Sequence, residues 1–277
     1  MPASNARAIE KARELPCDVV ILDLEDAVAP DAKDEARANA VAAVRAGGFG
    51  PREVVIRANG LDTPWGEADL KAAGEARPDA VLVPKISAPE DLAQVRKRLG
   101  EPMPLWAMIE TCAAIFRLDA LGAESVNEGV DAWVIGSNDL AKEMRCALTV
   151  EREALVTALS LSVMAARAYR LAIIDGVFNE IADAAGLARQ CAQAASLGFD
   201  GKSLIHPSQV VPANAAFTPD VEAVAWARTV VAAFGQPEAA GQGVLKVEGR
   251  MVERLHFAEA QRLIAVADAI EARELAG

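Results

Sequence analysis

The sequence predicts an α/β fold, a (β/α)8 TIM barrel followed by a C-terminal helical appendage. Short apolar runs recur every few dozen residues and alternate with longer helical patterns. The runs are uninterrupted rather than alternating with polar residues, which is typical of parallel strands buried on both faces. Most runs end on a residue able to do chemistry, and a barrel enzyme carries its active site at the carboxyl ends of its strands.

Seven strands are visible in chain order, and an eighth is not. They are residues 19–22, 54–56, 81–83, 105–109, 132–135, 171–174 and 203–205. Reactive residues close to their carboxyl ends are Asp23, Arg57, Lys85, Glu110, Asp139, Asp175 and His206. Helical patterns fall at 32–45, 88–99, 112–121, 150–169 and 183–197. This alternation predicts one barrel domain over residues 1–210.

Residues 211–277 differ in character and predict the appendage. A helical stretch covers 214–233, a strand-like run covers 244–247, and a last helix covers 256–273. A turn is expected at Glu248-Gly249-Arg250. Such an appendage packs on its own barrel or on a neighbouring subunit.

Composition narrows the functional class. The net charge of −12 argues against a nucleic-acid partner, because phosphate contacts need a basic face. The four cysteines are far apart and form no CxxC pair, so a reducing cytoplasm is expected rather than a disulfide framework. No apolar run reaches membrane-spanning length and no signal peptide is visible, so no membrane partner is expected.

Glu110 and Asp139 follow two successive strands, so their carboxylates are expected to meet at the mouth of the barrel. Two carboxylates there can hold one hard divalent cation, with Mg²⁺ as the favoured ion. The alternative is that either acid caps a helix, because Asp139 opens one and Glu110 precedes Thr111.

Two cationic side chains complete the predicted mouth. Arg57 can bind a carboxylate bidentately or polarise a carbonyl, and it can also pair with Glu25 or Asp26. Lys85 can form a Schiff base, as in a metal-free aldolase, but a charge partner for the acidic mouth is favoured.

The remaining candidates are an acidic cluster and a histidine. Asp23, Glu25 and Asp26 are either solvated acids or groups that orient Arg57 and metal-bound water. His206 is a general base or a histidine hydrogen-bonded into its loop. The glycine-rich turn before Lys202 lacks the strand–GxxxxGK[ST]–helix form, so a P-loop is rejected.

Taken in order, these segments resemble the citrate lyase β-subunit-like branch of the HpcH/HpaI aldolase family of CoA-ester lyases. The matching pieces are Pro2-Ala3-Ser4-Asn5 with Arg7, Leu22-Asp23-Leu24-Glu25-Asp26-Ala27-Val28, Ile56-Arg57-Ala58-Asn59, Val83-Pro84-Lys85, Met108-Ile109-Glu110-Thr111, Gly136-Ser137-Asn138-Asp139-Leu140 and Gly198-Phe199-Asp200-Gly201-Lys202-Ser203-Leu204-Ile205-His206-Pro207. The likeness covers almost the whole chain. Each piece alone is weak, but the ordered set is specific.

The resemblance implies a Mg²⁺-dependent carbon–carbon lyase. Such an enzyme cleaves or forms a β-hydroxyacyl-CoA, such as malyl-, citramalyl- or citryl-CoA, from an acyl-CoA and a 2-keto acid. CoA enters as part of the substrate, and a homo-oligomer, trimeric or hexameric, is expected.

The motif matches also imply roles for individual residues. The implied metal ligands are Glu110 and Asp139, and the implied catalytic residues are Arg57, Asp26 and Glu253. The implied substrate-binding residues are Arg57 and Glu110, with Asn5, Arg7 and Lys202 near the CoA.

Two features depart from the family pattern. The family begins with a hydrophobic strand before its Pro-x-x-Asn segment, so the first strand of the barrel is expected to be missing from this chain, which starts at Met1-Pro2. Many members also carry an Asp in the appendage, supplied to a neighbouring subunit's site, where this chain has Glu253. One extra methylene shifts that carboxylate, so Glu253 could serve, favour another substrate or be a surface acid.

Three other functions stay open on the sequence. The same site could run the condensation and hydrolyse the product, as a malate-synthase-like enzyme would. A class II aldolase acting on a free 4-hydroxy-2-keto acid would use Mg²⁺ and Arg57 but ignore CoA. A non-catalytic acyl-CoA-binding subunit of a larger lyase complex would bind and never turn over.

Overall fold

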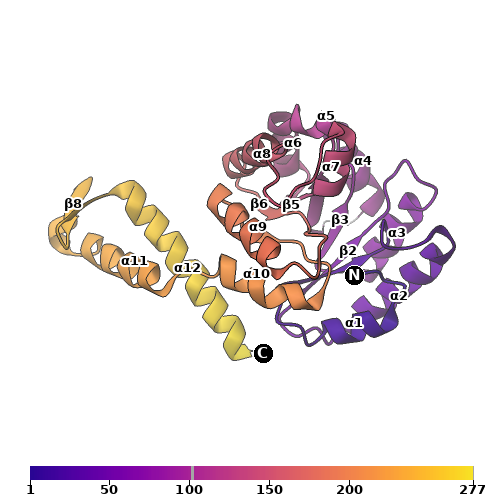
Figure 1. Ribbon diagram of the computed structural model, residues 1–277, viewed down its shortest axis with the longest axis horizontal. Helices are drawn as coiled ribbons and strands as arrows, with labels where there is room; N and C mark the ends of the chain where they lie inside the picture. Colours follow the sequence, from indigo (N-terminus) through magenta and orange to yellow (C-terminus); the bar gives the residue numbers. More distant parts are fainter. Residues whose placement is uncertain (101–102, 277) are drawn as a thin grey trace. The chain divides into compact units, whose positions relative to one another are not determined.

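The computed structural model describes residues 1–100 and 103–276 of the chain. The chain divides into two compact units, Met1–Phe217 and Thr218–Gly277. Figure 1 shows the first unit as a sheet surrounded by helices, and the second as helices with one hairpin. Each unit is described separately below.

The first unit is built on seven parallel strands in sequence order. They are β1 (Val19–Asp23), β2 (Glu53–Arg57), β3 (Ala80–Val83), β4 (Leu105–Ile109), β5 (Val130–Ile135), β6 (Ala172–Asp175) and β7 (Gly201–Lys202). The pairing is parallel throughout, so every carboxyl end lies at the same edge. The sheet is a half-barrel, an incomplete TIM barrel, which confirms the predicted architecture with seven of eight strands.

The first residues of the chain lie beside the free edge of β1. Pro2 forms a parallel bridge with Asp23, and the amide of Ala3 donates to the Asp23 carbonyl at 2.9 Å. The amide of Asp23 donates in turn to the Met1 carbonyl at 2.9 Å. These bonds place the predicted substrate-binding segment at Asn5 and Arg7 next to the carboxyl end of β1.

Ten helices accompany the sheet in the described part of the first unit. They are α1 (Ala6–Ala12), α2 (Lys33–Ala46), α3 (Gly66–Ala76), α4 (Pro89–Leu99), α5 (Cys112–Ile115), α6 (Leu118–Asn127), α7 (Ser137–Met144), α8 (Val156–Ala168), α9 (Ala184–Leu197) and α10 (Val210–Phe217). The longer ones pack side by side in chain order, α2 on α3, α3 on α4, α4 on α6, α6 on α8 and α8 on α9. This outer layer is what buries one face of the curved sheet.

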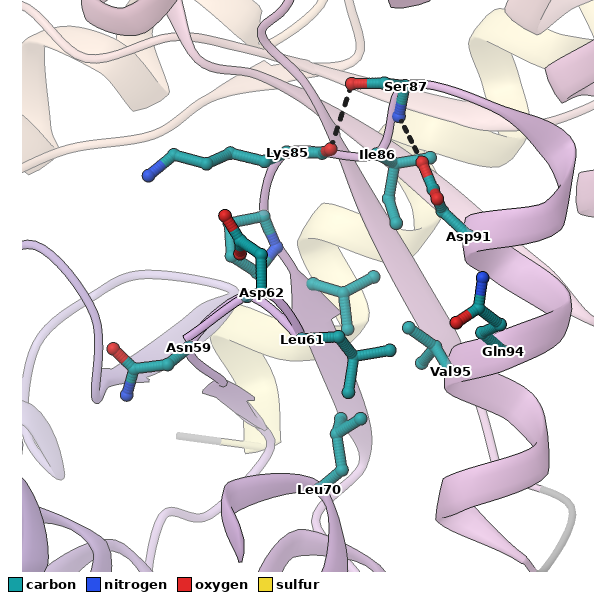
Figure 2. Close-up of a pocket in the computed structure, with 13 residues that line it drawn as sticks. Asn59, Leu61, Asp62, Leu70, Lys85, Ile86, Ser87, Asp91, Gln94 and Val95 are labelled. Atoms are coloured by element: carbon teal, nitrogen blue, oxygen red, sulfur yellow. Dashed lines mark hydrogen bonds between the residues drawn. The ribbon is translucent and has the colours of Figure 1, made fainter. Parts of the chain in front are cut away.

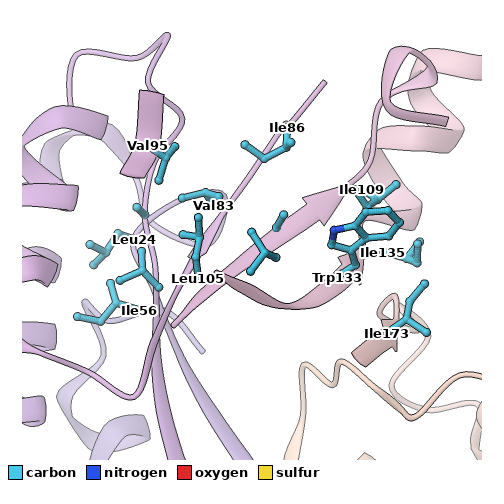
Figure 3. Packing of buried hydrophobic residues seen from close by; sticks show 14 of the residues in the cluster. Leu24, Ile56, Val83, Ile86, Val95, Leu105, Ile109, Trp133, Ile135 and Ile173 are labelled. Atoms are coloured by element: carbon cyan, nitrogen blue, oxygen red, sulfur yellow. The ribbon is translucent and has the colours of Figure 1, made fainter. Parts of the chain in front are cut away.

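Alternation along the strands separates two apolar layers. In β4, Leu105, Ala107 and Ile109 join the large cluster under the helices, whereas Trp106 and Met108 join a smaller cluster on the inner face. Figure 3 shows part of the outer cluster around Trp133. Because side chains alternate with period two, the same parity decides which residues at the strand ends face the barrel interior.

Two predicted helices are shorter or divided. The stretch 112–121 is two helices, α5 and α6, separated at Phe116 and Arg117. The stretch 150–169 becomes helical only at Val156, because Arg152 adopts a left-handed φ of 51° and turns the chain first. The residue types in the sequence before Val156 do not by themselves indicate such a turn.

The second unit pairs two helices with a hairpin. It contains α11 (Val221–Phe234), β8 (Val244–Val247), β9 (Arg250–Glu253) and α12 (Arg254–Ala276). The predicted turn lies between the strands, with positive φ at Glu248 and Gly249. A single predicted helix at 214–233 is wrong: Thr218-Pro219-Asp220 divides it into α10 and α11, and the Asp220 side chain caps α11.

The division between the units lies at residue 217 rather than at the predicted 210. Helix α10 belongs to the first unit because its Ala213 packs in a cluster with Leu187 and Cys191 of α9. Among the residues that the structure describes, no helix combines the length and apolarity needed to cross a membrane.

Candidate active site

Because side chains alternate between the two faces along each strand, three predicted side chains lie on the inner face of the sheet at the carboxyl ends of their strands. Arg57 follows the inward-facing Val55 by two residues, and Glu110 follows the inward-facing Met108 by two. Asp23 stands in the same relation to Ile21, which packs against the inner cluster. The carboxyl ends of β1, β2 and β4 therefore aim one acid, one guanidinium and a second acid into the same mouth.

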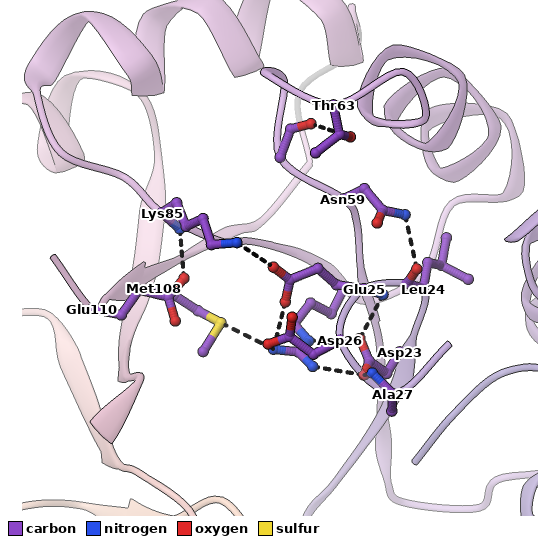
Figure 4. A network of polar contacts seen from close by, with 12 residues as sticks. Asp23, Leu24, Glu25, Asp26, Ala27, Asn59, Thr63, Lys85, Met108 and Glu110 are labelled. Carbon is purple, nitrogen blue, oxygen red and sulfur yellow. Dashed lines mark hydrogen bonds and ion pairs between the residues drawn. The ribbon is translucent and has the colours of Figure 1, made fainter. Parts of the chain in front are cut away.

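Arg57 is held by the acidic loop that follows β1. Its Nε and Nη2 donate to the two oxygens of Asp23, each at 2.6 Å, in a bidentate pair. Its Nη1 lies 2.8 Å from Glu25 Oε2 and 3.9 Å from Asp26 Oδ2. Figure 4 shows this cluster around the loop. The predicted pairing of Arg57 with the loop is present, with Asp23 as the main partner instead of Glu25 or Asp26.

The two members of this pair stabilise each other's charge. Burial acts to raise the pKa of Asp23, but hydrogen bonds and charge from Arg57 outweigh it, so the pKa lies below its usual value. For Arg57, burial acts to lower the pKa, and Asp23 with Glu25 raises it instead. The guanidinium is therefore a permanent cation at the mouth.

Glu25 links Arg57 to Lys85. Lys85 Nζ lies 3.4 Å from Glu25 Oε1. Burial raises the pKa of Glu25, and the charges of Arg57 and Lys85 only partly oppose that. Among the described residues, Glu25 Oε2 accepts no hydrogen bond although Arg57 Nη1 is 2.8 Å away, so this contact is an ion pair.

Lys85 is paired with Glu25, as expected of a charge partner for the acidic mouth. Burial acts to lower the pKa of its ammonium, but the charge and hydrogen bond of Glu25 raise it above the usual value. A Schiff-base lysine needs a lowered pKa, so the direction favours the charge-partner interpretation of the sequence.

Glu110 is buried at the end of β4 and is held from the neighbouring strand. Its Oε1 accepts the backbone N–H of Lys85 at 2.7 Å, and Lys85 adopts a left-handed φ of 55° there. Burial, with the charges of Glu25 and Asp139, raises the pKa of Glu110 to about 7 against the bond from Lys85. A cation beside this buried carboxyl would favour its ionised form.

The donor set fits Mg²⁺. Asp139 is half-buried in the first turn of α7, directly after β5, and its charge acts on both Glu110 and Lys85. Gly136 precedes α7, and a Cβ there would collide with Oε2 and Cβ of Glu110, so the glycine makes room for the Glu110 side chain. Among the described residues, no three His, Cys, Asp or Glu side chains converge on one point. Two carboxylates with open positions for water and substrate oxygens are the kind of site that Mg²⁺ accepts.

The other predicted site residues, apart from Lys202, are exposed. Asp26 is exposed at the rim, within 3.9 Å of Arg57. Asn5 is exposed and its side chain caps α1 by accepting from the Ala8 amide at 3.1 Å, and Arg7 is exposed on the same helix. Glu253 is exposed at the end of β9 in the second unit. Catalytic roles for Asp26 and Glu253 stay predictions.

Lys202 has internal partners instead of an open position. It pairs in register with Asp175, on the outer face of the sheet, and its ammonium donates to Asp175 Oδ2, the Gly176 carbonyl and Gln190 Oε1. Buried Arg152 donates to the other oxygen of Asp175 at 2.5 Å. All three N–H donors of Lys202 are used, so a contact with CoA would have to break one, and we do not include Lys202 in the proposed site.

The seventh strand is shifted from its predicted position. It covers Gly201–Lys202, and the apolar run at 203–205 leaves the sheet, with Ile205 about half exposed. His206 therefore caps a short 3-10 turn, and its Nδ1 accepts from the Ser208 amide at 3.2 Å. The loop-histidine interpretation is the one that the geometry favours.

A pocket of about 320 Å³ adjoins the mouth between the β2–α3 and β3–α4 loops. Leu70, Val83 and Val95 are among its apolar lining residues, and Asn59 and Lys85 also line it. Figure 2 shows Leu70, Val95, Asn59 and Lys85 around the pocket. Arg57, Glu110 and Asp139 do not line it. The pocket neighbours the carboxylate site without containing it.

Sequence reasoning missed the residues behind the loop. Lys33, Asn59 and Asp69 are buried and hydrogen-bonded to one another or to the loop backbone. Gly136 was also missed as a spacer for Glu110. A lysine at a helix start and an asparagine after a strand carry no signal of this kind by themselves.

Comparison with known proteins gives a consistent set of relatives. The model of the family described as HpcH/HpaI aldolase/citrate lyase matches residues 1–207. A (3S)-malyl-CoA thioesterase of Cereibacter sphaeroides (strain KD131 / KCTC 12085) is 43% identical over 272 residues, which is 98% of this chain and 94% of that protein. The mitochondrial citramalyl-CoA lyase of Homo sapiens is 29% identical, covering 98% of this chain and 85% of that protein.

A solved structure extends the likeness to three dimensions. CitE from Mycobacterium tuberculosis, in complex with magnesium, acetoacetate and coenzyme A, superposes with a TM-score of 0.78 at 28% identity. The match covers 97% of this chain and 96% of that chain.

Proposed function

Because the chain belongs to the HpcH/HpaI aldolase/citrate lyase family, we propose that it is a Mg²⁺-dependent carbon–carbon lyase acting on a β-hydroxyacyl-CoA. Malyl-, citramalyl- and citryl-CoA are the candidate substrates, and the products are an acyl-CoA and a 2-keto acid. The proposal is carried by Arg57 and Glu110, which follow inward-facing residues of β2 and β4, and by Asp139, whose charge acts on Glu110. The magnesium in a solved relative supports the metal.

The reaction needs positive charge beside the oxygens of the keto acid that is being formed. The hydroxyl proton leaves, the bond between the hydroxyl-bearing carbon and the α-carbon of the thioester breaks, and the electron pair passes to the thioester as an enolate, which takes up a proton. Bound Mg²⁺, held by Glu110 and Asp139, would supply positive charge at the hydroxyl and carboxylate oxygens. Arg57 would bind the keto-acid end through the second hydrogen of Nη2, because Asp23 takes Nε and one hydrogen of Nη2, and Nη1 faces Glu25 and Met108 Sδ.

Proton transfers fall to carboxylates near the reacting atoms. Asp26 is exposed at the rim beside Arg57, which suits exchange with solvent. Glu253 would supply the acid–base group that the family places in its C-terminal segment. Asn5 and Arg7 stay the proposed contacts of the CoA, since both are exposed beside the carboxyl end of β1.

Thioester hydrolysis is the second candidate reaction. The observation that favours it is the 43% identity with a (3S)-malyl-CoA thioesterase over almost the full chain. In that reaction water adds to the thioester carbonyl, the C–S bond breaks, and CoA leaves as a thiol after gaining a proton. The site would bind the same substrate but would need a carboxylate such as Asp26 to accept the proton of the attacking water.

Product analysis separates these reactions. Purified protein is incubated with malyl-CoA, citramalyl-CoA or citryl-CoA, with Mg²⁺ or with EDTA, and the products are identified by mass spectrometry. From malyl-CoA, lyase activity gives acetyl-CoA and glyoxylate, whereas hydrolysis gives malate and free CoA. A free-acid aldolase would cleave a 4-hydroxy-2-keto acid instead, without competition by free CoA.

We expect Glu110→Gln and Asp139→Asn each to abolish Mg²⁺-dependent turnover while the fold is retained. Each substitution keeps the shape of the side chain and removes the charge that holds the cation. Circular dichroism and thermal unfolding provide the fold control. Full activity in both variants would refute the metal assignment, and metal-dependent binding of acyl-CoA without turnover in the wild type would favour a non-catalytic subunit.

A further inference from the structure

Lys33 is buried beneath the acidic loop that follows β1. Its ammonium donates to the backbone carbonyls of Leu24 at 2.8 Å and Glu25 at 2.7 Å, and to Asn59 Oδ1 at 2.7 Å. The residue is only 6% exposed. These three bonds use all three donors of the ammonium, so its position is fixed from two sides.

Asn59 is itself fixed, so the lysine is part of a connected network. The Asn59 side-chain amide donates to the Leu24 carbonyl at 2.8 Å and to Asp69 Oδ2 at 2.6 Å. The other oxygen of Asp69 accepts Arg37 Nε at 2.6 Å. The network therefore joins the start of α2, the end of β2 and the first turn of α3 to the backbone of the loop.

The loop that Lys33 holds is the one that holds Arg57. Asp23 and Glu25 contact the guanidinium, and the Lys33 acceptors are the carbonyls of Leu24 and Glu25. Within the loop, the amides of Glu25 and Ala27 donate to the Asp23 carboxylate at 2.9 and 3.1 Å. A movement of the backbone at Leu24 or Glu25 would therefore displace both carboxylates and, with them, Arg57.

Besides its three hydrogen-bond acceptors, the ammonium of Lys33 faces the ring of Trp65, with Nζ 5.2 Å from the ring centroid. Burial lowers the pKa of Lys33, and the charges of Asp23, Glu25 and Asp69 oppose that change. A buried cation is expensive unless each donor is satisfied, and an apolar side chain of similar length would fill the space without that cost. The ammonium is explained by the loop carbonyls that it binds.

We propose that Lys33 is a positioning residue for the reaction: it fixes the backbone of the Asp-Leu-Glu-Asp loop so that Asp23 and Glu25 hold Arg57 against the keto-acid end of the substrate. This inference rests on the proposed function for its consequence, but not for the role of Lys33 in ordering the loop.

The test compares Lys33→Met with Arg96→Met in the full chain. Met fills the space of Lys33 without its donors. Arg96 is the matched control, because its guanidinium also binds backbone carbonyls, those of Glu128 and Met103 at 2.9 and 2.8 Å, but these precede β5 and β4 at the opposite edge of the sheet. Both variants lose bonds from a cation to the backbone, and only one loses them at the loop.

We expect Lys33→Met to speed amide hydrogen exchange at Glu25 and Ala27, and Arg96→Met to leave these amides unchanged. With Mg²⁺ present, the dissociation constant of pyruvate or glyoxylate, measured by calorimetry, should rise about tenfold to a hundredfold in Lys33→Met only. The dissociation constant of Mg²⁺ itself should change much less than that of the keto acid, because neither Glu110 nor Asp139 bonds to Lys33 and only the charge of Glu25 links the loop to Glu110. A merely structural defect would not separate the two ligands in this way.

Unchanged exchange and unchanged keto-acid affinity in Lys33→Met would overturn the inference, as would equal losses in Arg96→Met. If Lys33→Met does not fold, Lys33→Gln provides the same comparison. Its side chain is shorter and keeps a single NH₂ group as a donor. If the wild type neither binds a keto acid nor cleaves an acyl-CoA, the proposed function fails. The exchange experiment then still decides whether Lys33 orders the loop.

Discussion

Arg57 is the residue on which the geometry of the mouth depends most. Two of its donors hold Asp23, and a third nitrogen faces Glu25, so the guanidinium is placed before any substrate arrives. Preorganised donors are effective because they need not be reoriented when charge develops. The planar fork, rather than the charge alone, is what Asp23 recognises.

Arg57→Lys should therefore lower kcat/KM about a hundredfold or more, because an ammonium cannot pair bidentately with Asp23 and also bind the substrate. Arg57→Ala should in addition destabilise the protein by about 3–5 kcal/mol, since it leaves a buried carboxylate unpaired. Steady-state kinetics and urea unfolding measure the two effects. Exposed Arg45→Lys is the control, and normal kinetics in Arg57→Lys would contradict the bidentate role.

Glu110 should make stability fall as pH rises in metal-free protein. Its pKa is raised from 4.5 to about 7, so the unfolded chain loses this proton at a lower pH than the folded protein does. The stabilisation is present below pH 4.5 and is lost between there and about pH 7, by about 3 kcal/mol at 1.36 kcal/mol per unit.

Glu110→Gln should not show this part of the pH dependence, because Gln cannot ionise but can still accept the Lys85 amide. Urea unfolding in EDTA, at pH values below and above this window, measures the difference between wild type and variant. Glu25 has the same direction of shift and its charge acts on Glu110, so the difference between the two profiles reports Glu110 together with its interaction with Glu25. Identical pH profiles would show that Glu110 ionises normally.

At the scale of elements, the sequence was informative where a buried strand is followed by one polar residue. Strands β1 to β6 were located from their apolar runs, and the acids after β4 and β5 stay the predicted metal ligands. The outer or inner face was not assigned. Asp175 and Lys202 follow the same pattern at a strand end but lie one residue out of phase, so they face the helices. Only the pairing register, which is a tertiary property, decides this.

The junction between β5 and α7 is sterically constrained. Gly136 lies where a side chain would overlap Glu110 Oε2, and its φ is negative, so the constraint is space rather than backbone conformation. The sequence motif contained this glycine but gave no reason for it. The reason is the carboxylate on the neighbouring strand.

Gly136→Ala should therefore displace Glu110 and weaken Mg²⁺ binding and turnover about tenfold to a hundredfold. Calorimetric Mg²⁺ titration and product formation measure this. Gly243→Ala is the control, because a Cβ there meets no atom within 4 Å. Unaltered Mg²⁺ affinity in Gly136→Ala, with a folded protein, would mean that the position of Glu110 set by Gly136 does not determine cation binding.

At the scale of the whole molecule, the sequence predicted more of the first unit than of the second. A barrel repeats one strand–helix rhythm, so each unit of the pattern supports the next. The appendage has no such repeat, and Pro219 with Asp220 divided a stretch whose composition is helical on both sides. Glu253 lies in this second unit, and its proposed role depends on which chain's site it serves.

If Glu253 serves a neighbouring chain, two inactive variants should complement each other. Asp139→Asn lacks a metal ligand and Glu253→Gln lacks the acid, so neither forms a complete site alone. In a cyclic homo-oligomer that exchanges subunits freely, equal mixing should restore about a quarter of wild-type activity, because both intact groups then meet by chance at that fraction of sites. Activity is measured before and after mixing, and exchange is verified by native mass spectrometry with isotopically labelled protein.

Confirmed exchange without recovered activity would place Glu253 at its own chain's site or outside the reaction. Full activity of Glu253→Gln alone would remove it from the mechanism and leave Asp26 as the remaining acid–base candidate.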